Sequence, residues 1–133
     1  MTRLTRYARN ALLVIEAWLL LIGVQFVIFW IPFRITARGL TAMARPEEAP
    51  LILSQRVRVG VERAARLVPW RPQCLARAIA AKALLARRGY GATLSLGVAD
   101  PKGKLSAHAW LQTGAIVITG QSEMAKFGEV ARF

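Results

Sequence analysis

Hydrophobic and polar positions follow three different patterns along the chain, and the first is an apolar run. Leu12 to Phe33 is almost continuously apolar, and its strongly polar members are Glu16 and Gln25. Because these two lie nine residues apart, they fall on roughly opposite faces of a helix and leave it no polar stripe. The run therefore predicts either a helix buried in a compact domain, which we favour, or a short membrane span.

The second pattern is helical periodicity in a more polar background. After Pro32, a basic helix is expected over Ile35 to Arg45. The best candidate for a linker between the N-terminal region and the next helix is Pro46 to Pro50, which has two prolines and two acids. From Leu51 to Leu67 the apolar residues recur at helical spacing and arginines occupy much of the remainder. This segment predicts an amphipathic helix with a basic outer face, and a solvated face is the simplest role for its arginines.

A further helix is predicted within Leu67 to Tyr90, the stretch that holds the chain's one cysteine, Cys74. Pro72 suits the first helical position, and Gly89 offers a left-handed stop after two arginines in the last turn. Cys74 is thus expected in the first turn of a helix of about four turns. Unpaired N–H groups and the positive end of the helix dipole favour a thiolate there.

The third pattern begins beyond this helix, where the apolar period changes from helical to alternating. Thr93 to Val98, Leu105 to Gln112 and Ala115 to Thr119 read as three antiparallel strands, with Thr113-Gly114 as the tight turn between the last two. Gln121 to Phe133 shows no firm pattern. The predicted fold class is therefore α+β, with N-terminal helices followed by a cysteine-bearing helix packed on a small antiparallel sheet.

Composition narrows the chemistry. The chain carries 19 Lys and Arg against 7 acids, a formal net charge of +12, which favours anionic partners. One cysteine excludes an intramolecular disulfide, and with one histidine an ordinary protein-only His/Cys zinc site is excluded too. The aromatic residues lie mostly in the apolar run rather than between basic residues, so nucleic-acid binding is not expected. We expect no cofactor and a cytoplasmic protein.

The lone histidine, His108, falls in the second predicted strand. A thiol at a helix start, packed against an antiparallel sheet that carries a histidine, is the arrangement of cysteine acyl-transfer enzymes. With a two-residue turn at Thr113-Gly114, Thr119 would pair with His108, and Gln121 would be its diagonal neighbour. The nearest acid is Glu123. A non-catalytic basic membrane-associated adaptor, with a merely structural cysteine and histidine, is the alternative.

Three segments carry a resemblance to a known family. VPWRPQCLARAIAAKALLARRGY, LSLGVAD and SAHAWL resemble the transglutaminase-like leader peptidase of lasso-peptide biosynthesis. That family pairs a tryptophan just before a Cys-Leu helix with a Leu-Gly-Val strand and an Ala-His-Ala-Trp strand. The likeness is strong from Val68 to Leu111 and weaker elsewhere, where it includes IPFR.

The resemblance implies a cysteine peptidase that removes the leader from a ribosomally made precursor peptide. Cys74 matches the nucleophile and His108 the general base. The family's third residue is an aspartate after the histidine strand, and this sequence departs from the pattern, with Thr-Gly-Gln where the acid is expected. Because an amide can orient a neutral imidazole, we assign Gln121 to that role, with Thr119 and Glu123 as rivals.

The resemblance also implies an organisation and a set of partners. Residues 51–133 would form the peptidase core, and residues 1–50 an apolar and basic helical region, too short for the leader-recognition domain fused to longer members. We therefore expect a separate recognition protein to deliver the precursor peptide, and an ATP-dependent lasso cyclase to close the released core. Two alternatives stay open. The segment Leu12–Phe33 would contact a membrane, or the protein would be a transglutaminase-like acyl transferase, which uses the same cysteine and histidine.

Overall fold

The computed structural model describes residues 3–70, 74–99, 106–113, 116–120 and 128–133. Its elements in chain order are α1 (Arg3–Trp30), α2 (Phe33–Ala42), α3 (Leu51–Arg66), α4 (Cys74–Arg87), β1 (Thr93–Ala99), β2 (Ser106–Thr113), β3 (Ile116–Thr119) and β4 (Gly128–Arg132). The predicted α+β class is confirmed, with helices first and the sheet after them.

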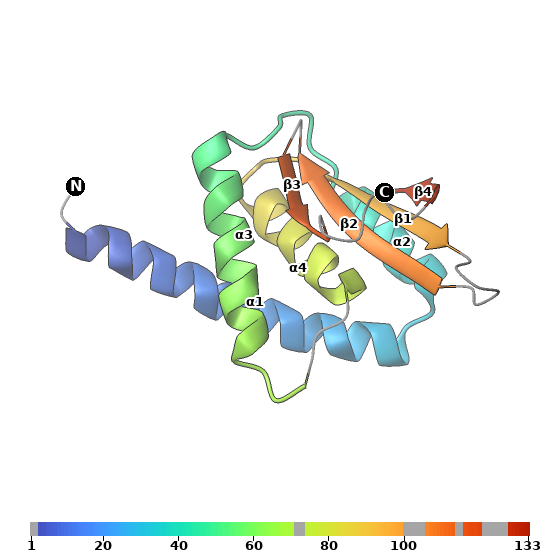
Figure 1. Cartoon of the computed structure of the whole chain (residues 1–133), viewed down its shortest axis with the longest axis horizontal. Coiled ribbons are helices and arrows are strands. Elements are labelled where there is room, and N and C mark those ends of the chain that lie inside the picture. Colours follow the sequence, from blue (N-terminus) through green and yellow to red (C-terminus); the bar gives the residue numbers. More distant parts are fainter. Residues whose placement is uncertain (1–2, 71–73, 100–105, 114–115, 121–127) are drawn as a thin grey trace.

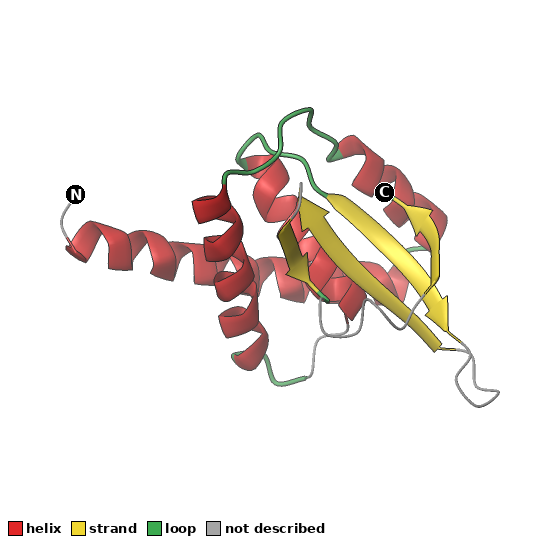
Figure 2. Cartoon of the chain, turned by 45° about the horizontal axis from the view of Figure 1, so that its top comes forward, coloured by secondary structure: helices red, strands yellow, loops and turns green. Residues whose placement is uncertain are grey.

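The strands form one antiparallel sheet in the order β3-β2-β1-β4. Figures 1 and 2 show α4 lying against one face of this sheet, with α3 beside it and α1 beneath. The core fills the space between the sheet, α4 and the inner faces of α1 and α3. The cysteine helix is therefore the central element, packed on both sides.

One face of α1 belongs to this core. Its buried residues recur every three or four positions and pack against α3 and α4; they are Leu13, Ala17, Leu21 and Val24. Glu16 ties the same helix to the end of α4, where its carboxylate pairs with Arg88 at 2.9 Å and also contacts Arg87. The favoured interpretation of the apolar run as a buried helix therefore holds for this face only, because the opposite face is exposed and 22% of the most apolar window is buried.

The end of α4 follows directly from its sequence. Gly89 has a φ of +88°, its N–H donates to Ala86 O at 3.0 Å, and the N–H of Tyr90 donates to Leu85 O at 2.9 Å. This pair of bonds is a Schellman motif, which glycine favours because it has no Cβ to clash in the left-handed region. The left-handed stop predicted at Gly89 is confirmed.

Lys82 joins the cysteine helix to the sheet. Only 2% of it is exposed, and its ammonium donates to the carbonyl oxygens of Ala92 and Phe133. Burial lowers the pKa of Lys82 from its ordinary value of 10.5, because desolvation disfavours the charged form.

The predicted turn between the second and third strands is wrong by one residue. Thr113 lies in β2 and pairs with Ile116, and an irregularity after Leu111 then brings Thr119 opposite Leu111 rather than His108. The reason is a pair of long-range hydrogen bonds: the buried Thr113 hydroxyl donates to Gly91 O at 3.0 Å and accepts from the Ala49 N–H at 3.1 Å. These bonds hold Thr113 in the strand and out of the turn.

Strand β4 was not predicted. It pairs with the outer edge of β1, and Leu94 and Phe133 exchange two backbone hydrogen bonds of 2.7 and 2.8 Å. Its sequence, Gly-Glu-Val-Ala-Arg, does not show the alternation that marks a half-buried strand. Its position depends on pairing with a strand some 30 residues earlier in the chain, which local pattern does not reveal.

Candidate active site

Cys74 is the first residue of α4, so its predicted place in the first turn is confirmed, while Pro72 lies outside the described residues. It is half-buried, and its Sγ accepts a hydrogen bond from the backbone N–H of Ala109 at 3.4 Å. Ala109 belongs to β2, an inner strand of the sheet. The helix start therefore brings the sulfur directly against the strand residue that follows His108. The first-turn N–H groups of α4 lack partners within their own helix and can stabilise negative charge at this point.

His108 lies in β2 opposite Gly97 of β1. Its Nε2 is 3.0 Å from the carbonyl oxygen of Gly120, just beyond the end of β3. The ring stacks on Trp110, with centroids 6.1 Å apart and planes at 27°. When the proton is on Nε2, the imidazole donates to Gly120 O, and this bond fixes the ring's tautomer and orientation.

Gly120 is a site residue that the sequence reasoning missed. Its φ is +79°, and a Cβ built there would lie 2.7 Å from Ala109 O and 2.9 Å from His108 Nε2. Real Cβ atoms do not approach backbone oxygen so closely, and side chains rarely adopt this φ. One sequence feature could have pointed to Gly120. It lies in Thr-Gly-Gln, at the place where the family that the sequence resembles has its acid. In this structure the backbone carbonyl of that glycine contacts the imidazole.

Three residues were predicted as candidates to orient the His108 imidazole, and the structure describes one of them, Thr119. Gln121 and Glu123 lie outside the described residues, so their roles stay predictions. Thr119 is 5% exposed, and its hydroxyl has no hydrogen-bond partner in the part of the chain that the structure describes. Its expected position opposite His108 is wrong, because it pairs with Leu111.

Arg77 supplies positive charge one turn into α4. Its Nη1 pairs with Glu62 Oε1 of α3 at 3.2 Å, and this bond holds the guanidinium near the beginning of the helix. Arg71, three residues before Cys74 in the sequence, lies outside the described residues. Within those residues we find no group of three or more His, Cys, Asp or Glu side chains able to hold a metal ion.

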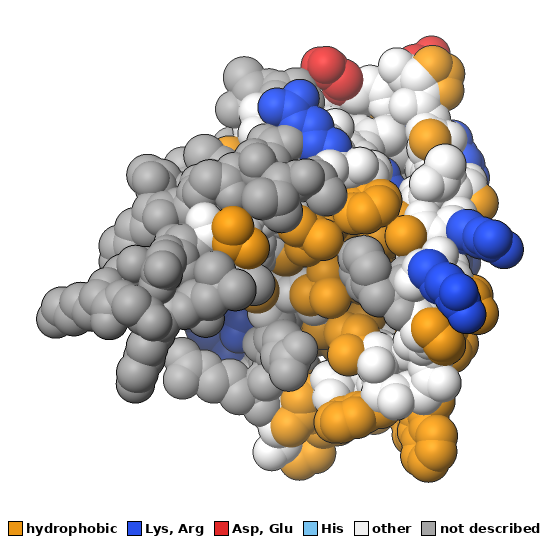
Figure 3. All heavy atoms as spheres, turned by 90° about the vertical axis from the view of Figure 1, so that its right-hand side faces the viewer, with side chains coloured by type: hydrophobic (Ala, Val, Ile, Leu, Met, Phe, Trp, Pro, Cys, Tyr) orange, Lys and Arg blue, Asp and Glu red, His pale blue; other side chains and the backbone are white. Residues whose placement is uncertain are grey.

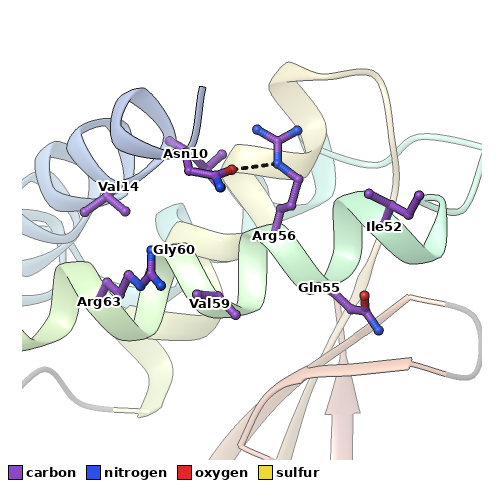
Figure 4. Close-up of a pocket in the computed structure, with 9 residues that line it drawn as sticks. Asn10, Val14, Ile52, Gln55, Arg56, Val59, Gly60 and Arg63 are labelled. Carbon is purple, nitrogen blue, oxygen red and sulfur yellow. Dashed lines mark hydrogen bonds between the residues drawn. The ribbon is translucent and has the colours of Figure 1, made fainter. Parts of the chain in front are cut away.

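A separate groove lies between α1 and α3, with a volume of about 230 Å³. In Figure 4, Arg56 of α3 points toward Asn10 of α1, and its Nε donates to Asn10 Oδ1 at 3.1 Å. Neither Cys74 nor His108 lines this groove. The candidate chemistry therefore belongs to the junction of α4 and β2 and not to this groove.

A thiol at a helix start, set against a sheet strand that carries histidine, is an arrangement typical of cysteine-dependent acyl-transfer enzymes. A family model for the transglutaminase-like superfamily matches residues 18–132. The chain therefore belongs to the transglutaminase-like superfamily, whose members are usually cysteine-based catalysts and include peptidases and acyl transferases. Searches of curated proteins and of solved structures gave no match. At superfamily level the resemblance seen in the sequence is confirmed.

Proposed function

We propose that this protein is a cysteine peptidase that removes the leader from a lasso-peptide precursor before macrolactam closure. The observation that carries the chemistry is the contact of Cys74 Sγ with the Ala109 N–H, directly after His108. The choice of substrate rests on the resemblance of the segments around Cys74 and His108, PWRPQCL and SAHAWL, to that peptidase. The reaction takes place in the cytoplasm, where the precursor is made.

The first half of the reaction forms an acyl-enzyme. The Cys74 thiolate attacks the carbonyl carbon of the peptide bond between leader and core, and a tetrahedral oxyanion forms. N–H groups at the start of α4 stabilise that charge. When the C–N bond breaks, the imidazolium of His108 gives its proton to the leaving nitrogen, so the core departs with a free amine and the leader remains as a thioester.

The second half hydrolyses the thioester. His108 takes a proton from water, the hydroxyl oxygen attacks the acyl carbon, and the C–S bond breaks to return the thiolate and release the leader as a carboxylate. The core's new amine is the group that a macrolactam requires, so cleavage must precede cyclisation.

Gly120 acts as a positioning residue in this scheme. Its carbonyl oxygen accepts from Nε2 of His108, so the remaining ring nitrogen, Nδ1, is the one that exchanges a proton with the sulfur. A carbonyl orients the ring but carries no full charge, and it therefore stabilises the imidazolium less than a carboxylate does. Gln121, the orienting side chain expected from the sequence, follows Gly120 directly.

We further propose that a separate recognition protein presents the leader and that an ATP-dependent cyclase takes the released core. Both partners rest on the resemblance of the segments around Cys74 and His108 to that peptidase.

The deciding experiment incubates the protein with precursor peptide and recognition protein in ¹⁸O-labelled water and follows masses. A peptidase releases leader that carries heavy oxygen in its new carboxylate, and Cys74→Ala should slow release by about 10⁴-fold or more. Leader joined to an added amine, without heavy oxygen, would instead identify an acyl transferase. Unchanged release by Cys74→Ala would refute both reactions at this cysteine.

A further inference from the structure

Helix α1 carries a second apolar face that the fold leaves uncovered. Six large side chains recur along it at helical spacing, and each is more than half exposed; they are Leu12, Ile15, Leu19, Phe26, Phe29 and Trp30. We call these six residues the outer stripe. Leu19 and Phe26 each lie two positions beyond a core residue, Ala17 and Val24, a rotation of about 200° around the helix. The stripe therefore faces away from the domain.

The size of this face sets it apart from ordinary surface. The run Tyr7–Trp30 is long and apolar enough to cross a membrane by length and composition, with mean hydropathy 2.5, yet only 22% of its most apolar window is buried. From Leu12 to Trp30 the stripe extends about 27 Å along the helix. A shallow depression of about 250 Å³, lined by Val14, Ile15, Trp18 and Leu67, adjoins it. A continuous apolar surface of this kind marks an interaction site.

Basic residues stand at both ends of the stripe. Arg9 precedes it, and Arg34 and Arg38 follow it on exposed positions of α2. Figure 3, which looks at the side of the molecule that carries α2, shows hydrophobic side chains gathered over the middle and lower edge, with Lys and Arg side chains beside them. If the α1 helices of two copies packed through their stripes, arginines would meet in a parallel or an antiparallel arrangement, so this charge pattern opposes self-association.

We propose that the outer stripe docks α1 flat in the interface of an anionic lipid bilayer, with the flanking arginines among the headgroups. Apolar side chains would enter the acyl boundary and arginines would meet anionic phosphates, the two terms that drive interfacial binding. An interfacial helix needs a side that faces water. Here the rest of the domain, packed on the opposite face of α1, takes that side.

The packing of α1 argues against a transmembrane orientation. A span would pull Leu13, Ala17, Leu21 and Val24 away from α3 and α4. It would also separate Glu16 from Arg87 and Arg88 and carry its carboxylate into hydrocarbon, where an ionised group is costly. Docking through the outer stripe preserves all these contacts, so binding is peripheral and independent of Cys74 chemistry.

The test is co-sedimentation of the full-length protein with vesicles of phosphatidylcholine, alone or mixed with phosphatidylglycerol. We expect binding to the anionic vesicles, partial release by salt and full release by carbonate. Leu19→Gln with Phe26→Gln should weaken binding by at least about tenfold. The matched control is Ile52→Gln with Val59→Gln, two exposed apolar positions on α3, which should bind as wild type.

Circular dichroism and the rate of Cys74 alkylation should be the same in all variants, which separates loss of docking from loss of fold and from failure of the peptidase assignment. The proposal is overturned if the wild type does not bind anionic vesicles, or if both double variants bind equally. Carbonate-resistant binding, or a dimer that the Leu19/Phe26 variant disrupts, would also overturn it, in favour of a span or of a second copy.

Discussion

At the scale of single residues, the site depends on a backbone carbonyl that only a glycine can present. Gly120 combines a left-handed φ with contact distances below 3 Å from a Cβ to Ala109 O and His108 Nε2. Any side chain would push β2 and the imidazole away from Gly120 O. The orientation of His108, and through it the reactivity of Cys74, should therefore be sensitive to this position.

Gly120→Ala should lower leader cleavage by on the order of 10²-fold and shift the pH profile of Cys74 alkylation, because the imidazole loses its oriented hydrogen bond. The residue's own strain should also lower the free energy of unfolding by about 1–3 kcal/mol. Gly39→Ala is the matched control, since a Cβ there meets no atom within 4 Å and no left-handed φ is required. An unchanged alkylation profile in Gly120→Ala would show that this carbonyl does not position the ring.

His108→Ala should make Cys74 react more slowly with iodoacetamide at neutral pH, because an adjacent imidazolium stabilises the thiolate. The chain has one cysteine, so the alkylation rate reports on Cys74 alone. Gln112→Ala, on the same strand and half-exposed, should react as wild type. If both variants alkylate at the wild-type rate, the imidazole does not act on the sulfur.

At the scale of elements, α1 divides its apolar side chains between a buried and an exposed face. Leu21 is 0% exposed in the core, and Leu19, two positions earlier, is 57% exposed. The two leucines therefore make a matched pair within one helix.

Leu21→Ala should lower the free energy of unfolding by about 2–5 kcal/mol, because it removes buried methyl groups and leaves a cavity. Leu19→Ala should change it by no more than about 0.5 kcal/mol. Urea unfolding in detergent-free buffer measures both. Equal small effects would mean that α1 does not pack on α3 and α4 in solution.

The buried Lys82 should give the fold a pH dependence of definite sign. Its pKa is lowered in the folded state, so between that value and 10.5 the folded chain binds fewer protons than the unfolded chain. The free energy of unfolding therefore rises with pH across this window. Below the window Lys82 is protonated in both states, so it adds no pH dependence. Urea midpoints measured from neutral pH upward should rise in wild type relative to Lys82→Met. Parallel pH curves for the two proteins would contradict the lowered pKa.

The sequence predicted elements with strong local signals and missed those fixed by distant contacts. The Cys74 helix and its stop at Gly89 could be predicted because periodicity and capping are local. The turn after β2 could not, because Thr113 is held by Gly91 and Ala49. Strand β4 and the contact of Gly120 with His108 likewise depend on partners far along the chain.

At the scale of the whole molecule, the fold separates two surfaces. The junction of α4 and β2 holds Cys74 and His108, and the outer stripe of α1 lies on the side of that helix away from the core. A peptidase docked through α1 would keep its reactive cysteine on the domain rather than in the lipid.

Cleavage by this protein alone should be slow, and a recognition protein that binds the leader should raise the rate by increasing its effective concentration, to about the mM range for a short tether. Initial rates at sub-saturating precursor, with and without that partner, measure the effect. Equal rates would remove the partner from the scheme.

The central claim is that Cys74 forms a thioester with the leader, and intact-mass measurement of acid-quenched reactions tests it most directly. With precursor and recognition protein present, wild-type protein should gain the mass of the leader minus water, located on the fragment that contains Cys74. Cys74→Ala should show no adduct and no released leader. Leader release that continues at the wild-type rate without this adduct, or in Cys74→Ala, would contradict the account.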